Sequence, residues 1–172
     1  MVGKLDWEPA AGRPDLLADP VAAAIGGVAD AETAPIDPDL ADTAAFCERY
    51  DVPLEVSANC VVVAAKRGGE VAYAACMVLA TGRADVNGVV RKHLGARKVS
   101  FAPMDQATSL TGMEYGGITP VGLPAGWPIL VDEAVAAAPR VVIGSGLRKS
   151  KILLPGKALA GLPGAEVIAL GR

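Results

Sequence analysis

The sequence has few aromatic residues, few cysteines and a single histidine, and each shortage excludes a class of protein. Seven of the 172 residues are aromatic, too few for a protein that stacks one nucleic-acid base after another. The three cysteines are widely spaced and only one histidine could join them, so we expect neither a disulfide framework nor a metal site. The sequence also lacks a complete dinucleotide fingerprint and a P-loop, and we expect no cofactor.

Long apolar runs are also missing. The longest unbroken one covers residues 71–80, about half of the ~20 residues that a membrane-spanning helix needs. The first residues, Met-Val-Gly-Lys-Leu-Asp-Trp-Glu-Pro, include acids where a secretory leader would be apolar. We therefore predict a cytoplasmic protein that does not bind membranes.

Charge is unevenly distributed along the chain. Residues 1–51 contain eleven acids and three bases, a net charge of −8, whereas residues 52–172 contain eight acids and thirteen bases, a net charge of +5. A basic body attracts polyanions such as RNA. An ordinary solvated surface accounts equally well for so modest an excess.

The length favours one domain, and the 32 alanines and 20 valines favour a core of small side chains. Residues 1–36 are rich in Pro, Ala, Gly and Asp, and we expect an N-terminal arm with one short helix around residues 16–25. The ordered domain should then span residues 37–172, beginning where Asp37 can cap a helix that has Pro38 as its first residue.

Hydrophobic spacing predicts alternating helices and strands after residue 36. Helices are expected at 37–50, 85–94, 132–138 and 155–162. Strands are expected at 61–65, 71–80, 99–102, 129–131, 140–143, 152–154 and 166–170. The Gly- and Pro-rich residues 103–128 are predicted to form a functional loop region. A hairpin turn at Gly68-Gly69 makes the sheet mixed, so we predict an α+β domain in which a curled, barrel-like mixed sheet is surrounded by helices.

The densest cluster of special residues is Gly116-Gly117-Ile118-Thr119-Pro120-Val121-Gly122. Adjacent glycines let the backbone approach a ligand and expose consecutive N–H groups, while Pro120 stiffens the exit. The segment is therefore a candidate site for a phosphate or a developing oxyanion. A tight structural turn is the alternative, because Gly-Gly and Pro mark turns in many proteins.

A second glycine cluster, Gly144-Ser145-Gly146-Leu147-Arg148, follows a predicted strand. Strand ends are where open sheets place their ligand crevices. Arg148, Lys149 and Lys151 add positive charge there. The alternative is a glycine turn with solvated lysines.

Nucleophilic and acid–base candidates are weak. His93 is the only histidine, so a Ser-His-Asp or Cys-His mechanism would have to use it, but its predicted helix-surface position favours an ordinary amphipathic side chain. Cys60 lies in a run of valines, which is typical of an inert buried thiol. Helix capping accounts for the adjacent Asp132 and Glu133.

Four segments together resemble the YbaK-like family of aminoacyl-tRNA deacylases, which also occurs as the editing insertion domain of bacterial prolyl-tRNA synthetases. They are residues 59–69, 112–122, 129–132 and 142–148, and the resemblance extends over roughly residues 38–170. Its most specific part is the segment from Gly116 to Pro120, which is similar to the family's Gly-x-x-x-Pro loop. The resemblance implies a mixed-sheet α+β fold and hydrolysis of the ester that joins a wrong amino acid to the 3′ end of tRNA.

The resemblance also implies a site. In the family, N–H groups of the loop hold the aminoacyl carbonyl or its oxyanion, and a lysine at the start of the central strand engages the substrate near the terminal adenosine. Here Asn59 stands in place of that lysine and Lys151 in place of an aspartate. By this resemblance Gly116 and Asn59 are the catalytic residues, and the substrate-binding residues are Gly117, Thr119, Pro120, Gly144, Ser145, Gly146 and Arg148.

Three hypotheses follow. The first is a trans-acting deacylase of mischarged tRNA whose chemistry depends on backbone donors and substrate groups rather than on a titrating side chain. The second is a weakened or inactive module that binds aminoacyl-tRNA or a nucleotide. The third is a domain kept for protein contacts. The glycine loops beside basic residues favour the first two, and the missing lysine favours the second over the first.

Overall fold

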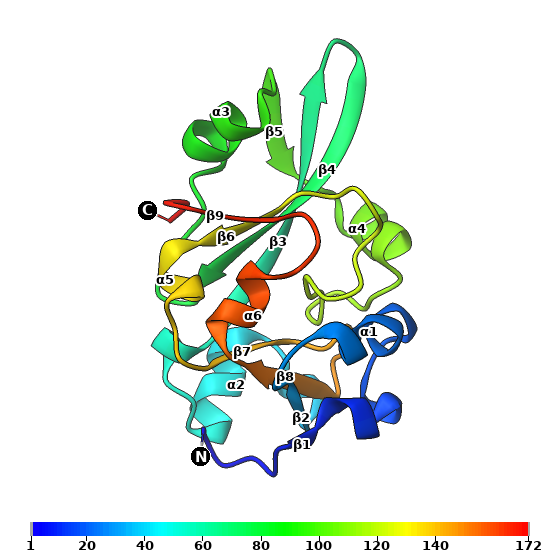
Figure 1. Ribbon diagram of the computed structural model, residues 1–172, viewed down its shortest axis with the longest axis vertical. Helices are drawn as coiled ribbons and strands as arrows, with labels where there is room; N and C mark the ends of the chain where they lie inside the picture. Colours follow the sequence, from blue (N-terminus) through cyan, green and yellow to red (C-terminus); the bar gives the residue numbers. More distant parts are fainter. Residues whose placement is uncertain (1, 172) are drawn as a thin grey trace.

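Two open β-sheets form the framework of the computed structural model, which describes residues 2–171 (Figure 1). One sheet has the strand order β1-β2-β8-β7, and the other has the order β5-β3-β4-β6-β9. The strands are β1 (Glu8–Pro9), β2 (Glu32–Pro35), β3 (Ala58–Arg67), β4 (Glu70–Leu79), β5 (Lys98–Phe101), β6 (Ile129–Asp132), β7 (Val141–Gly144), β8 (Ser150–Leu154) and β9 (Ala165–Ile168). The α-helices are α1 (Asp19–Ala24), α2 (Thr43–Tyr50), α3 (Arg91–Leu94), α4 (Met104–Thr111), α5 (Glu133–Ala136) and α6 (Gly156–Ala160).

The mixed α+β class is confirmed, but the single barrel-like sheet is wrong. Strands β7 and β8 pair with each other and with β2, so they form a sheet of their own. A parallel bridge between Ser57 and Val142 connects the two sheets. The apolar spacing identified β7 and β8 as strands but could not identify their partner, because β2 comes from the N-terminal segment.

The hairpin of β3 and β4 is confirmed and is the longest element of the fold. Its register runs from Ala58 opposite Leu79 to Arg67 opposite Glu70. Gly68 and Gly69 have φ values of +55° and +84°, the positive values that a two-residue hairpin turn demands. The strands carry the chain from the sheet junction to one end of the molecule (Figure 1).

The N-terminal segment packs into the core. Its short helix is observed as α1, and Leu17, Val21 and Ile25 are buried against residues of β6, β7 and β8. Strand β2 pairs with β8 along its whole length. Residues 2–36 are therefore integrated into the structure, and the division of the chain at residue 37 stays a prediction.

The Gly- and Pro-rich region at 103–128 contains a helix that the sequence did not predict. Helix α4 follows Pro103 and buries Ala107 and Thr111. Because most of its residues are polar or exposed, its apolar periodicity is weak. Within residues 2–171 no helix is long and apolar enough to cross a membrane.

Candidate functional site

A pocket of about 440 Å³ lies where the start of β3, the end of β7, the N-terminus of α2 and the loop at residues 115–118 meet. Asn59, Gly116 and Gly144 all line it. A strand start and the two glycine clusters therefore meet at one pocket. The chemical roles of these residues stay predictions.

The two glycine clusters hold each other in place. The Gly146 N–H donates to the Gly117 carbonyl at 2.7 Å, and the Glu114 N–H donates to the Gly146 carbonyl at 2.8 Å. A Cβ atom on Gly144 would lie 2.5 Å from the Gly117 oxygen, closer than any tolerated contact. A side chain at Gly144 would therefore separate the two loops.

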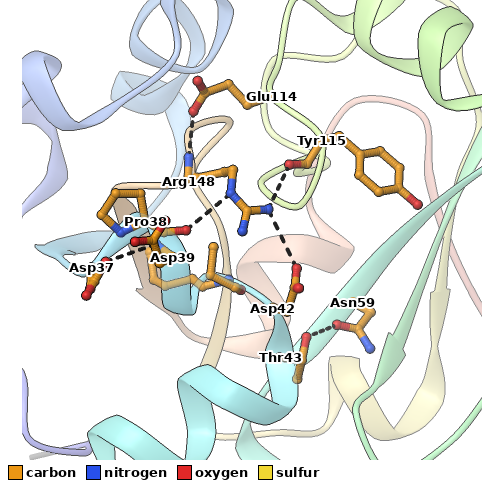
Figure 2. Close-up of polar contacts among 11 residues, drawn as sticks. Asp37, Pro38, Asp39, Asp42, Thr43, Asn59, Glu114, Tyr115 and Arg148 are labelled. Atoms are coloured by element: carbon orange, nitrogen blue, oxygen red, sulfur yellow. Dashed lines mark hydrogen bonds and ion pairs between the residues drawn. The ribbon is translucent and has the colours of Figure 1, made fainter.

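Gly116 occupies a turn that leaves its N–H unused. The Gly117 N–H donates to the Glu114 carbonyl at 3.0 Å, and Gly116 has φ +89°, which is typical of the third residue of a type II turn. The Tyr115 carbonyl accepts from Arg148 Nη1 at 3.2 Å (Figure 2). Since N–H and C=O point in opposite directions across a trans peptide, the Gly116 N–H points away from Arg148, and it has no acceptor within residues 2–171.

Arg148 braces this turn rather than lining the pocket (Figure 2). Its backbone N–H donates to Glu114 Oε1 at 2.7 Å, and its Nε donates to the Pro38 carbonyl at 3.2 Å. Asp42 Oδ1 lies 3.6 Å from Nη1. A Cβ on Gly116 would lie 2.2 Å from Nη1, so the guanidinium packs directly on the glycine.

Asn59 is held by α2. Thr43, the first residue of that helix, donates from Oγ1 to Asn59 Oδ1 at 2.6 Å (Figure 2). The amide oxygen of Asn59 is thus satisfied. Its NH₂ group has no protein acceptor among residues 2–171 and is left to donate to a ligand.

Lys151 is the site residue that the sequence interpretation missed. It lines the pocket from β8 and is 7% exposed. Its Nζ donates to the Ala41 carbonyl at 2.8 Å and lies 5.1 Å from the centre of the Phe46 ring. Burial lowers the pKa of Lys151 to about 8, partly opposed by Cys47 and Asp42.

Of the two interpretations left open for this region, solvated lysines are excluded for Lys151, because β8 lies between β2 and β7 and all five of its residues are buried. The apolar run Ile152-Leu153-Leu154 directly after it was the available signal. A lysine in a central strand is flanked by a strand on each side and is therefore buried, so its ammonium group needs hydrogen-bond partners within the protein.

The other predicted substrate-binding residues lie outside the pocket lining. The Ser145 hydroxyl is buried and 2.6 Å from the Ser150 hydroxyl, which indicates a structural role in the turn. Thr119 is fully buried and its hydroxyl has no partner within residues 2–171. Gly117 and Gly146 provide the loop contacts described above, and Pro120 borders a different cavity.

That second cavity, of about 770 Å³, is larger but has few polar or ionisable side chains in its lining. Residues 120–128 and 161–164 form much of its lining. The ionisable side chains that line it are those of His93 and Glu166, which pair with each other at the surface. His93 therefore lies outside the pocket of Asn59 and Gly116. This position is consistent with the expected ordinary surface side chain.

Two exposed aromatic side chains stand at the candidate pocket. Phe101 is 67% exposed and Tyr115 is 55% exposed, and both line the pocket. Removing exposed apolar ring surface from water is favourable, so these rings are available to stack on a planar ligand. Within residues 2–171 no cluster of His, Cys, Asp and Glu has the arrangement of a metal site.

Comparisons with known proteins agree with this fold. The family described as "Aminoacyl-tRNA editing domain" matches residues 37–162. A crystal structure of a candidate trans-editing enzyme for prolyl-tRNA synthetase is 20% identical, with a TM-score of 0.77, covering 90% of this chain and 96% of that one. A structure from a study of epitope grafting on scaffold proteins is 20% identical, with a TM-score of 0.76 over 90% of this chain and 97% of that one. At this identity the two structures show a shared fold.

Proposed function

We propose, since the chain belongs to the aminoacyl-tRNA editing domain family, that it is a trans-acting deacylase that hydrolyses the ester of mischarged tRNA. The observation that carries this proposal is the pocket itself. It combines an unused backbone donor at Gly116, the Asn59 amide and a buried lysine, Lys151. Those are groups that bind an ester carbonyl and stabilise negative charge on it.

The reaction needs a donor where charge develops. The ester carbonyl accepts from the Gly116 N–H, and water adds to the carbonyl carbon, so that the carbonyl oxygen becomes an oxyanion. The bond to the tRNA 3′ oxygen then breaks. The water supplies hydroxyl to the amino acid and its proton to the tRNA oxygen. A donor already fixed in a turn loses no freedom at this moment, which is the origin of its catalytic effect.

Lys151 supplies the positive charge of the pocket. The resemblance puts a lysine at position 59, where this chain has Asn59, and an aspartate at position 151. The buried ammonium therefore approaches the pocket from β8 instead of β3. With two of its three N–H groups lacking an acceptor within residues 2–171, it stabilises the charge that develops on the ester.

Arg148 acts as a positioning residue. Its bond to the Tyr115 carbonyl fixes the orientation of the 115–116 peptide and hence the direction of the Gly116 N–H. Phe101 and Tyr115 offer stacking surfaces to the terminal adenine, a contact worth about 1–3 kcal/mol per base.

The test is release of amino acid from a panel of correctly and incorrectly charged tRNAs by the purified protein. The deacylase proposal expects turnover of at least one mischarged tRNA well above the rate of spontaneous hydrolysis. Saturable binding of aminoacyl-tRNA without turnover of any member would favour the non-catalytic binding module instead, which the Asn at position 59 supports. Absence of both binding and turnover would refute both.

A further inference from the structure

One end of the molecule carries a concentrated positive charge that lies outside the pocket. Six of the thirteen bases in residues 52–172 gather there, and we call this surface the basic tip. It comprises Lys66, Arg67, Arg91, Lys92, Arg97 and Lys98. The tip of the β3–β4 hairpin, the start of β5 and helix α3 form it together, at the end opposite the N-terminus (Figure 1).

Backbone and side-chain contacts hold these bases close together. Lys66 and Lys98 are directly opposite each other in the β3–β5 ladder, and the Arg97 N–H donates to the Lys66 carbonyl at 2.9 Å. The Arg67 guanidinium reaches to 3.5 Å from where a Cβ would stand on Gly95, which caps α3. An open hollow of about 700 Å³ lies between the hairpin tip and the start of β5.

The charge is not neutralised by the protein. Within residues 2–171 none of the six bases takes part in an ion pair. Glu70, opposite Arg67 in the hairpin register, is the acid that lines the hollow. Like charges directly opposite in a ladder destabilise a sheet, so the Lys66–Lys98 arrangement costs stability unless an anion sits against it.

Protection of a sheet edge explains only part of this surface. Strand β5 is an edge strand, and a lysine there discourages pairing with another chain. That reason applies to Lys98. It does not apply to Lys66 on the inner strand β3, nor to Arg91 and Lys92 on α3.

We propose that the basic tip binds the phosphate backbone of the tRNA whose 3′ end occupies the pocket. This proposal rests on the proposed function. Strand β3 leads from Asn59 in the pocket to Lys66, a span of about 23 Å at ~3.3 Å per residue. Stacked bases lie about 3.4 Å apart, so a span of this length covers several nucleotides and the tip meets RNA several nucleotides away from the ester.

The chemistry of the tip favours backbone contacts over base recognition. Its six residues are all lysine or arginine, and no aromatic residue occurs in residues 66–72 or 91–98. Such a surface neutralises phosphates without selecting a sequence. It therefore suits a substrate that differs in sequence from one tRNA to the next.

The experiment compares two double variants that each remove two positive charges. The first is Lys66→Gln with Lys98→Gln, and the matched control is Lys4→Gln with Lys157→Gln, two exposed lysines away from the tip. Binding of uncharged tRNA is measured over a range of salt concentrations. Each lost phosphate contact reduces the magnitude of the slope of log affinity against log salt by about 0.7–0.9. The slope of the tip variant should therefore be smaller in magnitude by about 1.5, and its tRNA binding at low salt at least several-fold weaker. The slope and affinity of the control should be unchanged.

A tip variant with the same slope and affinity as the control overturns the proposal. The proposal is also overturned if a DNA duplex binds as tightly as tRNA and loses as much affinity in the tip variant. The tip would then be a general polyanion site. A melting temperature no lower than that of the natural chain shows that the variant is folded. The aminoacyl ester of adenosine is too short to reach the tip. The proposal is supported if both variants hydrolyse this ester and only the tip variant has a raised KM for charged tRNA. Absence of hydrolysis of either substrate, with tip-dependent tRNA binding intact, refutes the deacylase and not the tip.

Discussion

Replacing the buried Lys151 by methionine should stabilise the protein while impairing its function. The pKa of Lys151 falls from 10.5 to about 8 in the fold because burial disfavours the charged form. A difference of about 2.5 in pKa corresponds to about 3 kcal/mol of destabilisation at neutral pH. Methionine fills a similar volume and keeps contact with the Phe46 ring, but the Ala41 carbonyl loses its donor, which costs about 1 kcal/mol. The net expectation is a gain of about 2 kcal/mol at pH 7.

The pH dependence of unfolding independently gives the sign of the contribution of Lys151 to stability. Between pH 8 and 10.5 the unfolded chain still holds the lysine proton while the folded protein has released it, so the stability of the natural chain rises with pH through this window. Lys151→Met lacks this rise. Burial raises the pKa values of the Cys60 and Cys76 thiols in both proteins, so their contributions cancel in the difference.

The assay is urea unfolding of the natural chain, Lys151→Met and the control Lys149→Met, whose lysine is exposed. The stability advantage of Lys151→Met should shrink from pH 8 upward, vanish before pH 10.5 and reverse slightly there, because the cost of about 1 kcal/mol for the lost hydrogen bond to Ala41 remains when the charge penalty is gone. Lys149→Met should match the natural chain throughout. A Lys151→Met protein less stable than the natural chain at pH 7, or a gap independent of pH, would refute the reasoning.

Four further predictions concern activity on a mischarged tRNA. After subtraction of spontaneous hydrolysis, the rate should fall as pH rises through about 8 in the natural chain and not in Lys151→Arg, because only the lysine loses its charge there; a rise would identify a general base. Gly116→Ala should lower single-turnover rates by about a hundredfold, as loss of an oxyanion donor does, because φ of +89° and a Cβ 2.2 Å from Arg148 Nη1 both displace the turn. Asn59→Lys should bring no gain in kcat, since a second ammonium would oppose the one already present; a gain would mark the natural chain as a weakened enzyme. His93→Ala should retain near-full kcat/KM, as its place at the other cavity requires.

Local patterns predicted most individual elements but not how they assemble. The β3–β4 hairpin is encoded by two apolar runs around Gly68-Gly69, and the structure has it in full register. The separation into two sheets depends on β2, whose four residues Glu-Thr-Ala-Pro carry no strong strand pattern. Pairing of β2 with β8 over more than a hundred residues of chain is a tertiary choice that spacing does not encode.

The site shows the same division. Glycines at 116 and 144 mark positions where the backbone closely approaches another backbone segment or a ligand, and that signal is local; both residues line the candidate pocket. Lys151 was missed because the burial of a lysine depends on which strands flank it. Asn59 and Lys151 come from different sheets, and nothing in their separation along the chain indicates that they line one pocket.

The most direct test of the central claim is the ratio of single-turnover deacylation rates of Lys151→Met and Lys149→Met on the mischarged tRNA that the natural chain turns over fastest. The two variants remove the same charge two residues apart, one inside the pocket and one at the surface. If the pocket is an ester-hydrolysing site whose positive charge is Lys151, Lys149→Met keeps the natural rate and Lys151→Met is about a hundredfold slower. Equal rates in the two variants would contradict the claim.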